Sequence, residues 1–309
     1  MSADATRGGF AAIVGAPNAG KSTLVNRLVG TKIAAVTHKA QTTRAPVRGV
    51  VMLGASQIVL VDTPGIFAPR RRLDRAMVEA AWRGAGDADV IVVLVDAAQL
   101  AAKHRLPQDD DDVARVLEGL GAMKVPAVLA LNKVDAMAPA DLLKLADAFS
   151  KAGAFEKIFM ISAQTGSGVD DLLADLAARM PEGPWLYPED QAADIPMRLL
   201  AAEITREKLY LRLHDELPYA STVETERWSE LKDGSVRIEQ VIYVERDGQK
   251  AIVLGKGGQT IKAIGADARR ELEEMLERRV HLFLFVKVRE RWSEDPAHYR
   301  DIGLETPKE

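Results

Sequence analysis

The sequence predicts an α/β protein with two domains: a mostly parallel sheet with one antiparallel strand and helices on both faces, then a small α+β domain. Between Phe10 and about Met180, short apolar runs alternate with segments of helical periodicity. The segment Pro181–Pro196 has four prolines and no periodicity, which is typical of an interdomain linker. We therefore predict a loose N-terminus over residues 1–9, a first domain over 10–180, a linker over 181–194, and a second domain with a C-terminal tail over 195–309.

The expected elements follow the chain in order. The first domain has six candidate strands: Phe10–Val14, Val47–Leu53, Gln57–Val61, Val90–Val95, Val125–Leu131 and Lys157–Ile161. Because little more than Gly54-Ala-Ser56 separates the second run from the third, we expect an antiparallel hairpin there. The helices expected between the strands are Lys21–Val29, Leu73–Ala85, Asp112–Leu120, Ala140–Ala152 and Val169–Ala178.

In the second domain we expect helices over Met197–Leu213 and Thr260–Arg278. The alternating runs Ser221–Leu231 and Ser235–Val244 predict a hairpin, and Val280–Val288 predicts a final strand. From about Pro296 onward we expect a loose end.

Composition limits the possible functions. With 47% hydrophobic and 28% charged residues, the 309-residue chain is ordinary for a soluble globular protein. It has no cysteine, so a metal would be bound by oxygen ligands. No apolar run approaches the roughly 18 residues that span a bilayer, and the N-terminus lacks a signal-peptide core, so we expect a cytoplasmic protein. The net charge of −4 restricts any nucleic-acid surface to a local patch.

The phosphate-binding candidate is GAPNAGKS, placed between an apolar strand and an amphipathic helix. Its glycines allow backbone N–H groups to turn toward phosphate oxygens, and the helix N-terminus adds partial positive charge. We expect the lysine of this motif to reach the β- and γ-phosphates and its serine to ligate Mg²⁺. The residues of this loop are Gly15, Ala16, Pro17, Asn18, Ala19, Gly20, Lys21 and Ser22.

Three further motifs follow predicted strands and indicate that the nucleotide is guanine. In the first, Asp62 is suited to hold Mg²⁺ through a water, and the N–H of Gly65 to sense the γ-phosphate. In the second, the Asp135 carboxylate can accept hydrogen bonds from guanine N1–H and its amino group, a pairing that adenine lacks. The candidate nucleotide-binding residues of these motifs are Asp62, Thr63, Pro64 and Gly65 with the following Ile66; Asn132, Lys133, Val134 and Asp135; and Ser162, Ala163 and Gln164.

The polar, aperiodic segment Thr31–Pro46 contains Gln41, Thr42, Thr43 and Arg44. A loop that brings a hydroxyl to Mg²⁺ only when the γ-phosphate is present has this character. Thr43 is the preferred ligand and Thr42 the alternative, and both remain compatible with the sequence.

The ordered set GAPNAGKS, QTTR, DTPG, NKVD and SAQ resembles the translation-factor-related branch of small GTPases. In the second half, AEITREKL, ELPY, VER, GQK and GKGG resemble the bacterial GTPase family Era, and the resemblance covers about Phe10 to Trp292. It implies a GTPase domain that uses GTP, GDP and Mg²⁺, followed by a type II KH domain. It further implies binding to the 3′ region of small-subunit ribosomal RNA during subunit assembly, by a monomer that associates peripherally with the inner membrane.

Ile66 follows DTPG, where Ras-like enzymes have the glutamine that orients the attacking water, so intrinsic hydrolysis should be slow. GTPases that resemble this chain in having asparagine in the phosphate loop use K⁺ where others use an arginine finger. Asn18 is either that asparagine or a structural residue of a tight loop. The candidate catalytic residues are Lys21, Asn18, Thr43 and Gly65.

The GKGG motif is the candidate RNA site. In KH domains such a loop clamps single-stranded RNA, because glycines admit the sugar-phosphate backbone and the lysine supplies charge. Pattern alone makes the preceding Ala251–Leu254 a strand, whereas the resemblance implies a short helix, which we adopt. Ile252, Ile261 and Ile264 either form an adjacent groove or belong to the core, and we expect Trp185, Trp228 and Trp292 to pack rather than stack on bases. The candidate RNA-binding residues are Lys250, Gly255, Lys256, Gly257, Gly258 and Lys262.

Two other functions compete with a GTP-hydrolysing assembly switch. One is a GTP-gated RNA-binding scaffold in which hydrolysis is incidental, and the other is a P-loop nucleotide kinase. NKVD argues against the kinase, because it commits the pocket to guanine recognition rather than to a second phosphoryl acceptor.

Overall fold

The computed structural model describes residues 5–152, 155–295, 299 and 302–305. Its backbone contacts divide the chain into two compact units. The first unit holds the residues up to Ala34 together with Thr43–Asp194, and the second holds Ala35–Thr42 together with the residues from Ile195 onward. Among the described residues, no helix is both long and apolar enough to cross a membrane.

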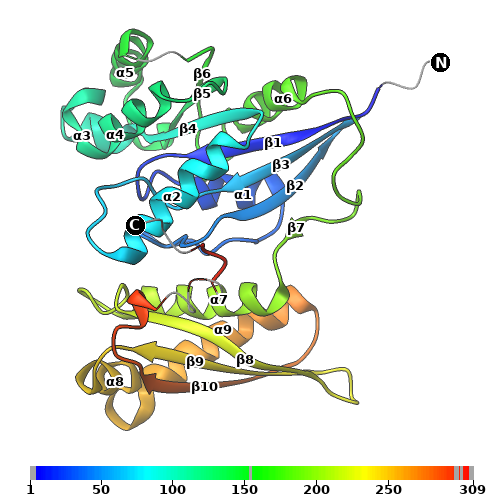
Figure 1. Cartoon of the computed structure of the whole chain (residues 1–309), viewed down its shortest axis with the longest axis vertical. Helices are drawn as coiled ribbons and strands as arrows, with labels where there is room; N and C mark the ends of the chain where they lie inside the picture. Colours follow the sequence, from blue (N-terminus) through cyan, green and yellow to red (C-terminus); the bar gives the residue numbers. More distant parts are fainter. Residues whose placement is uncertain (1–4, 153–154, 296–298, 300–301, 306–309) are drawn as a thin grey trace. The chain divides into compact units, whose positions relative to one another are not determined.

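The sheet of the first unit runs in the order β6-β5-β4-β1-β3-β2-β7 (Figure 1). Pairing is parallel from β6 through β1 to β3, and β2 is antiparallel to both of its neighbours. The described strands are β1 Arg7–Val14, β2 Val47–Leu53, β3 Ser56–Asp62, β4 Val90–Asp96, β5 Ala127–Asn132, β6 Ile158–Met160 and β7 Ala193–Asp194. This arrangement confirms the predicted fold class and the hairpin of β2 and β3.

Helices cover both faces of this sheet because its central strands are apolar on both sides. Ala11 and Ile13 of β1 belong to the core under α1 and α6, whereas Ala12 and Val14 belong to the core under α2 to α5. The helices are α1 Lys21–Val29, α2 Arg72–Gly86, α3 Ala97–Ala102, α4 Asp111–Gly121, α5 Pro139–Ala152 and α6 Val169–Arg179, with 3-10 turns η1 Pro107–Asp109 and η2 Val134–Ala136.

The first unit differs from the sequence prediction in three places. The expected loose N-terminus is wrong at Arg7–Gly9, which pair with β3; residues 1–4 lie outside the described part. Helix α3 was not predicted, and the Asp96 carboxylate caps it by accepting the Gln99 N–H at 2.9 Å. Within the predicted linker, β7 pairs with β2 and covers that edge of the sheet.

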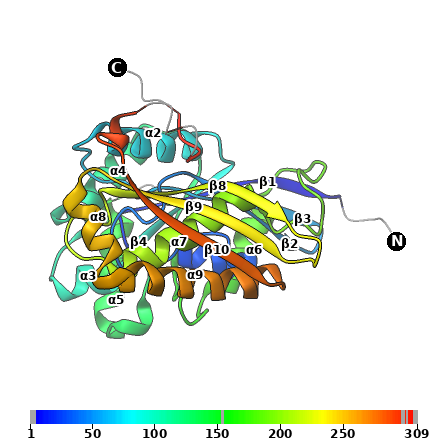
Figure 2. The same ribbon diagram turned by 90° about the horizontal axis from the view of Figure 1, so that it is seen from below.

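The second unit has an α-β-β-α-α-β order, which is that of the type II KH domain the resemblance implied. Its sheet runs β10-β9-β8, with β8 antiparallel and β10 parallel to β9. Helices α7 and α9 lie behind this sheet in Figure 2. Helix α8 replaces the strand that pattern alone suggested, so the resemblance was the better guide there. The elements are α7 Met197–Arg212, β8 Ser221–Glu230, β9 Val236–Val244, α8 Asp247–Leu254, η3 Lys256–Gly258, α9 Gln259–Leu276, β10 Val280–Val288 and η4 Trp292–Glu294.

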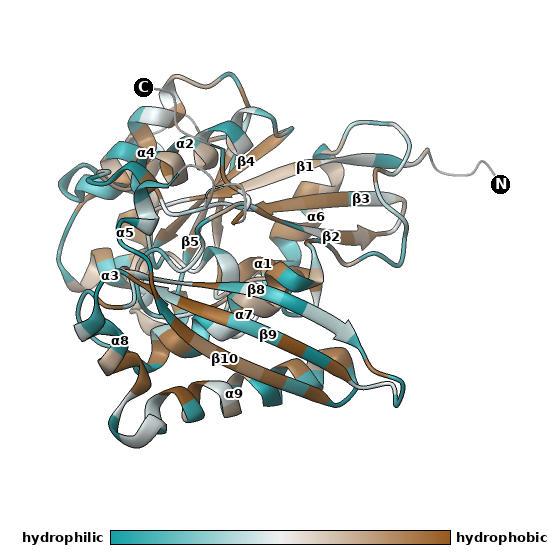
Figure 3. Ribbon diagram, turned by 60° about the horizontal axis from the view of Figure 1, so that its bottom comes forward, coloured by the Kyte–Doolittle hydropathy of each residue, from teal (hydrophilic) through white to brown (hydrophobic). Residues whose placement is uncertain are grey.

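Hydrophobic residues along β9 and β10 (brown in Figure 3) form the core of this unit with the helices. Trp292 is fully buried, and its indole N–H donates to the Ala220 carbonyl at 3.0 Å, which confirms its packing role. The expected loose C-terminus is wrong at Tyr299, Ile302 and Leu304, which are buried; the Tyr299 hydroxyl also donates to the Ser293 carbonyl at 2.7 Å. The other residues from 296 onward, apart from 303 and 305, lie outside the described part.

Candidate functional sites

The first candidate site is the loop between β1 and α1. At Gly15 a Cβ would lie 2.2 Å from the Leu94 carbonyl oxygen, and at Gly20 it would lie 2.4 Å from the Asn132 amide nitrogen. Gly20 also has φ of 100°, in the region that favours glycine. No side chain caps α1 in the described structure, so its first backbone N–H groups are available to an anion.

Two buried charges lie at this loop. The Lys21 ammonium donates to the carbonyls of Gly15 and Ala16 at 3.1 and 2.9 Å. Burial lowers the pKa of Lys21 to about 8, against the attraction of Asp62. Burial also raises the pKa of Asp62 to about 6, against the hydrogen bond from Ser22 and the charge of Lys21. Both groups lack full compensation for their lost hydration, which is typical of a site that receives a charged ligand.

Three oxygen side chains converge beside Lys21. The Ser22 hydroxyl donates to Asp62 Oδ2 at 2.7 Å, and the Thr43 hydroxyl lies 2.7 Å from Ser22 Oγ and 3.2 Å from the same carboxylate oxygen. The other oxygen, Asp62 Oδ1, is buried and has no hydrogen-bond partner among the described residues. Two hydroxyls and a carboxylate with an unsatisfied oxygen are a donor set that fits Mg²⁺.

The structure separates the two candidate threonines of the loop. Thr43 joins Ser22 and Asp62, whereas the Thr42 hydroxyl donates to the Lys39 carbonyl at 2.8 Å and lies 2.6 Å from the Thr37 hydroxyl. The geometry therefore favours Thr43 over Thr42 as a metal ligand.

The NKVD motif begins with two residues that brace other loops. The Asn132 amide donates to the Ala19 carbonyl at 2.8 Å and accepts the Ala163 N–H at 2.9 Å. The Lys133 ammonium donates to the Asn18 carbonyl at 2.9 Å and forms a 2.6 Å ion pair with Asp96. These contacts tie the phosphate loop to the ends of β4, β5 and β6.

Asp135, in contrast, is exposed at η2 and has an accessible carboxylate. The Ser162-Ala-Gln164 loop is fixed by Arg27 of α1, whose guanidinium donates to the Ala163 carbonyl at 3.1 Å. An accessible carboxylate and a loop fixed by hydrogen bonds thus follow β5 and β6 at this edge of the sheet.

The structure also explains what the DTPG motif lacks. Ile66 is fully buried in the core under α2, and its N–H donates to the Gly15 carbonyl at 3.1 Å. It cannot orient a water molecule. Gly65 lies against Pro17, since a Cβ there would lie 3.0 Å from the Pro17 Cα, so its backbone is close to the phosphate loop.

The second candidate site is the loop between α8 and α9. Gly255, Gly257 and Gly258 have φ of 71°, 60° and 77°, which explains the need for glycine at each position. Lys256 is exposed at its tip. A Cβ on Gly257 or Gly258 would meet no atom within 4 Å, so the loop surface is open to a ligand.

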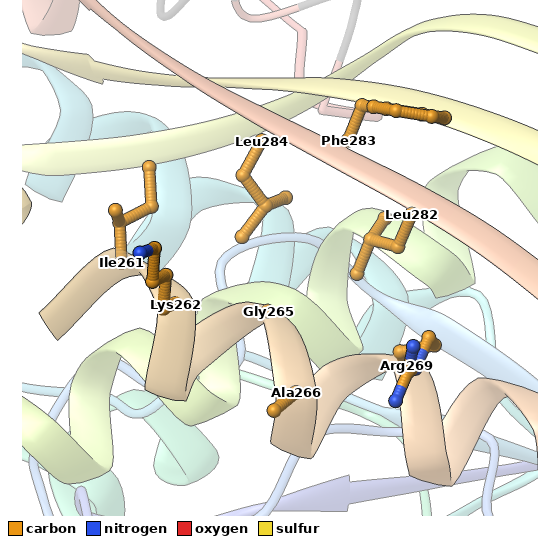
Figure 4. Close-up of a pocket in the computed structure, with 8 residues that line it drawn as sticks. All are labelled: Ile261, Lys262, Gly265, Ala266, Arg269, Leu282, Phe283 and Leu284. Atoms are coloured by element: carbon orange, nitrogen blue, oxygen red, sulfur yellow. The ribbon is translucent and has the colours of Figure 1, made fainter. Parts of the chain in front are cut away.

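A groove of about 340 Å³ runs along α9 and β10 (Figure 4). Leu282 and Leu284 point from β10 toward α9, which contributes Ile261, Lys262 and Arg269. Gly265 keeps the groove open, since a Cβ there would lie 3.3 Å from Leu284 Cδ1.

The three isoleucines for which a groove or a core position was expected lie in different surroundings, and three cations near the groove share one property. Ile264 is fully buried in the core and Ile252 is 58% exposed on α8, so Ile261 alone of the three lines the groove. In the described part of the chain, the side chains of Lys256, Lys262 and Arg269 have no ion pair.

Two family models match this chain, and each covers mainly one of its two compact units. A family model described as a 50S ribosome-binding GTPase matches residues 10–133, and a KH-domain model matches residues 216–293. The GTPase Era of Rhizobium meliloti is 62% identical over 303 residues, which is 98% of this chain and 94% of the relative. The chain belongs to the Era family of GTPases.

Two solved Era structures are similar over the same extent. Era in complex with MgGDPNP and nucleotides 1506–1542 of 16S ribosomal RNA has a TM-score of 0.90 and 37% identity, covering 96% of this chain and 99% of that one. A tyrosine-to-alanine variant of Aquifex aeolicus Era bound to GDP·AlF4⁻ has a TM-score of 0.88 and 38% identity with the same coverage. As an Era-family protein, the chain is a GTPase and not a nucleotide kinase.

Sequence reasoning missed contacts that only the fold brings together. Asp96 of β4 was not a candidate, although it pairs with Lys133 of the NKVD motif. Its position directly after an apolar strand, as for the motifs that were found, was the available signal. The membership of Ala35–Thr42 in the second unit had no sequence signal, because it depends on contacts between segments more than 160 residues apart.

Proposed function

We propose that this Era-family GTPase binds the 3′ region of small-subunit ribosomal RNA and couples that binding to its GTP cycle during assembly of the subunit. The main support is the similarity, over 96% of the chain, to an Era bound to both MgGDPNP and that RNA region. The open glycine loop and the adjacent groove of the second unit support the same proposal.

The nucleotide site we propose is the loop from Gly15 to Ser22. Backbone N–H groups at the start of α1 bind phosphate oxygens, and Lys21 neutralises the β- and γ-phosphates. Ser22, Thr43 and Asp62 would hold Mg²⁺, which when bound neutralises the charge that develops on the phosphates. Asn132 and Lys133 hold the loops in place.

We expect Asp135→Asn to shift the preference from guanine to xanthine nucleotides. The carboxylate accepts from two donors of guanine, whereas an amide offers one acceptor and one donor, which suits the second carbonyl of xanthine. Competition of GTP, XTP and ATP for the wild type and the variant tests this. The wild type should prefer GTP over ATP by at least about a thousand-fold. Wild-type affinity for ATP within about tenfold of that for GTP would contradict the guanine assignment.

We propose K⁺ as the ion that replaces the missing glutamine. Asn18 is exposed and has φ of 63°, a left-handed conformation that asparagine tolerates better than most residues, and its carbonyl accepts a hydrogen bond from the Lys133 ammonium. GTP hydrolysis should be faster in KCl than in NaCl at equal ionic strength, and Asn18→Ala should remove the difference while sparing GDP binding. Equal rates of the wild type in both salts would contradict a role for K⁺.

The RNA site we propose combines the loop Gly255–Gly258 with the groove along α9. The sugar-phosphate backbone would pass over the loop, where Lys250, Lys256 and Lys262 supply charge, and bases would lie on Ile261, Leu282 and Leu284. Within the described residues these lysines form no ion pair, so a phosphate would bind them without breaking one.

The direct test of coupling is GTP turnover with and without a short oligonucleotide from the 3′ end of the small-subunit RNA, or with the subunit itself. The switch requires RNA to change the turnover rate. If RNA binds but leaves turnover unchanged, the protein acts as a scaffold with incidental hydrolysis.

We also propose that the protein is cytoplasmic and contacts the inner membrane peripherally. Fractionation of cells would test this localisation.

A further inference from the structure

The segment Ala35–Thr42 is part of the loop that ends at the proposed Mg²⁺ ligand Thr43. It belongs to the second compact unit, where its partners are α7 and the residues that follow it. The Val36 N–H donates to Glu207 Oε2 at 2.8 Å. The Lys39 ammonium donates to the Tyr210 carbonyl at 2.6 Å and also to the Leu213 carbonyl, at the C-terminal end of α7. A cation is favoured there because helix carbonyls are left without partners.

The last contact of this segment is made by Thr42, the residue directly before Thr43 in the sequence. The Arg206 guanidinium donates to the Thr42 carbonyl, one peptide bond from Thr43. Arg206 is 1% exposed, and its Nε donates to Glu203 at 2.8 Å while its guanidinium lies 5.1 Å from the centre of the Tyr210 ring. These contacts fix the orientation of the guanidinium, because the hydrogen bond to Glu203 and the contact with the Tyr210 ring each restrict the directions in which its N–H groups can point.

Burial alone would lower the pKa of Arg206, but the charge of Glu203 outweighs it and holds the pKa above its usual value. The Arg206 guanidinium therefore stays charged, and its orientation is fixed by Glu203 and Tyr210. Its remaining N–H groups can donate to a carbonyl oxygen.

We propose that Arg206 is a positioning residue for the GTP form of the protein. By holding the Thr42 carbonyl, it turns the following residue so that the Thr43 hydroxyl faces Ser22 and Asp62. This inference rests on the proposed Mg²⁺ site. GDP has no γ-phosphate and does not need Thr43, so Arg206 should affect the affinity for GTP but not for GDP.

The test compares affinities for a non-hydrolysable GTP analogue and for GDP, both with Mg²⁺, in Arg206→Gln. We expect the affinity for the analogue to fall about tenfold, the scale of one charge-assisted hydrogen bond, and the affinity for GDP to stay within about twofold. Arg212→Gln is the matched control: it removes the same charge from α7, where Arg212 pairs with Asp267 at 3.1 Å, but has no bond to Ala35–Thr42.

Lys39→Met gives a second measurement that does not disturb a buried ion pair. Lys39 lies within the segment and binds the carbonyls at the C-terminal end of α7, so this variant removes the second cationic contact that holds the segment. It should also lower the affinity for the GTP analogue. The double variant Arg206→Gln/Lys39→Met should lose less than the sum of the two single losses, because both act on one segment. If Arg206→Gln does not fold, Arg206→Lys takes its place in the comparison, because it keeps the charge but loses the planar guanidinium that reaches both Glu203 and the Thr42 carbonyl.

Equal losses for the analogue and for GDP would mean that Arg206 only stabilises the fold, and no loss for either would also overturn the inference. Thr43→Ala separates this inference from the site on which it rests. If Thr43→Ala leaves the analogue affinity unchanged, the Mg²⁺ assignment is wrong. If Thr43→Ala weakens the analogue but Arg206→Gln does not, only the role of Arg206 is wrong.

Discussion

Lys21→Ala should reduce GTP hydrolysis by at least about 10²–10³-fold, the typical loss when one group that stabilises transition-state charge is removed. Lys21 is only 6% exposed and its ammonium donates to two loop carbonyls, so water cannot take its place without rearrangement. Single-turnover hydrolysis with saturating Mg²⁺ measures the effect.

The matched control is Lys151→Ala, which removes an exposed lysine of α5 that pairs with Asp147. It should leave the rate unchanged. Lys21→Met keeps most of the side-chain volume and distinguishes the loss of charge from the loss of packing: we expect it to be as inactive as Lys21→Ala. Substantial turnover by Lys21→Met would show that the charge of Lys21 is not what stabilises the phosphates.

Lys256→Asp/Gly257→Asp should lower the affinity for single-stranded RNA by orders of magnitude and leave GTP hydrolysis without RNA unchanged. On the proposed RNA path it places two carboxylates where phosphates would pass, and it adds a Cβ where the RNA backbone would approach. Gly257 has φ of 60° and no atom near its would-be Cβ, so the cost to folding is the strain of one left-handed residue, about 1–2 kcal/mol. Filter binding over a salt series measures both the affinity and its salt dependence.

The hairpin turn between β8 and β9 offers a control of the same chemistry. Lys232 is exposed, and Gly234 has φ of 81° with open space around it, so Lys232→Asp/Gly234→Asp makes the same change of charge and the same backbone strain. The control turn lies before the start of β9, whereas the GKGG loop follows the end of β9 and helix α8, so the two loops are separate sites. Equal RNA affinities for the two double variants would mean that the GKGG loop is only a turn.

The parts of the fold that could be predicted from the sequence are those with a local physical cause. Apolar runs gave the strands, and Gly54-Ala-Ser56 gave the hairpin, because a short connection leaves the chain no other geometry. The phosphate loop followed from glycines between a strand and a helix. Ala251–Leu254 shows the limit, since a four-residue apolar run fits a strand and a helical turn equally well, and in the structure only Val253 of the four is buried.

The parts that could not be predicted depend on partners distant in sequence. Nothing local distinguishes Thr42 from Thr43, and only their contacts with Lys39 and with Asp62 separate them. Similarly, β7 consists of Ala193–Asp194 in a segment without periodicity, and it is a strand because the edge of β2 lies beside it. Such residues take their conformation from the surrounding fold and carry little signal of their own.

No single cut divides this chain into its two compact units. Ala35–Thr42 leaves the first unit at Ala34 and returns to it at Thr43, so a fragment ending at Asp194 would keep the phosphate loop but lose Arg206 and Glu207. Exchange of the second domain for another RNA-binding module would require that Ala35–Thr42 and α7 be transplanted as a pair. The GTPase domain and the KH domain are therefore constrained to change together, even though each has its own sheet and core.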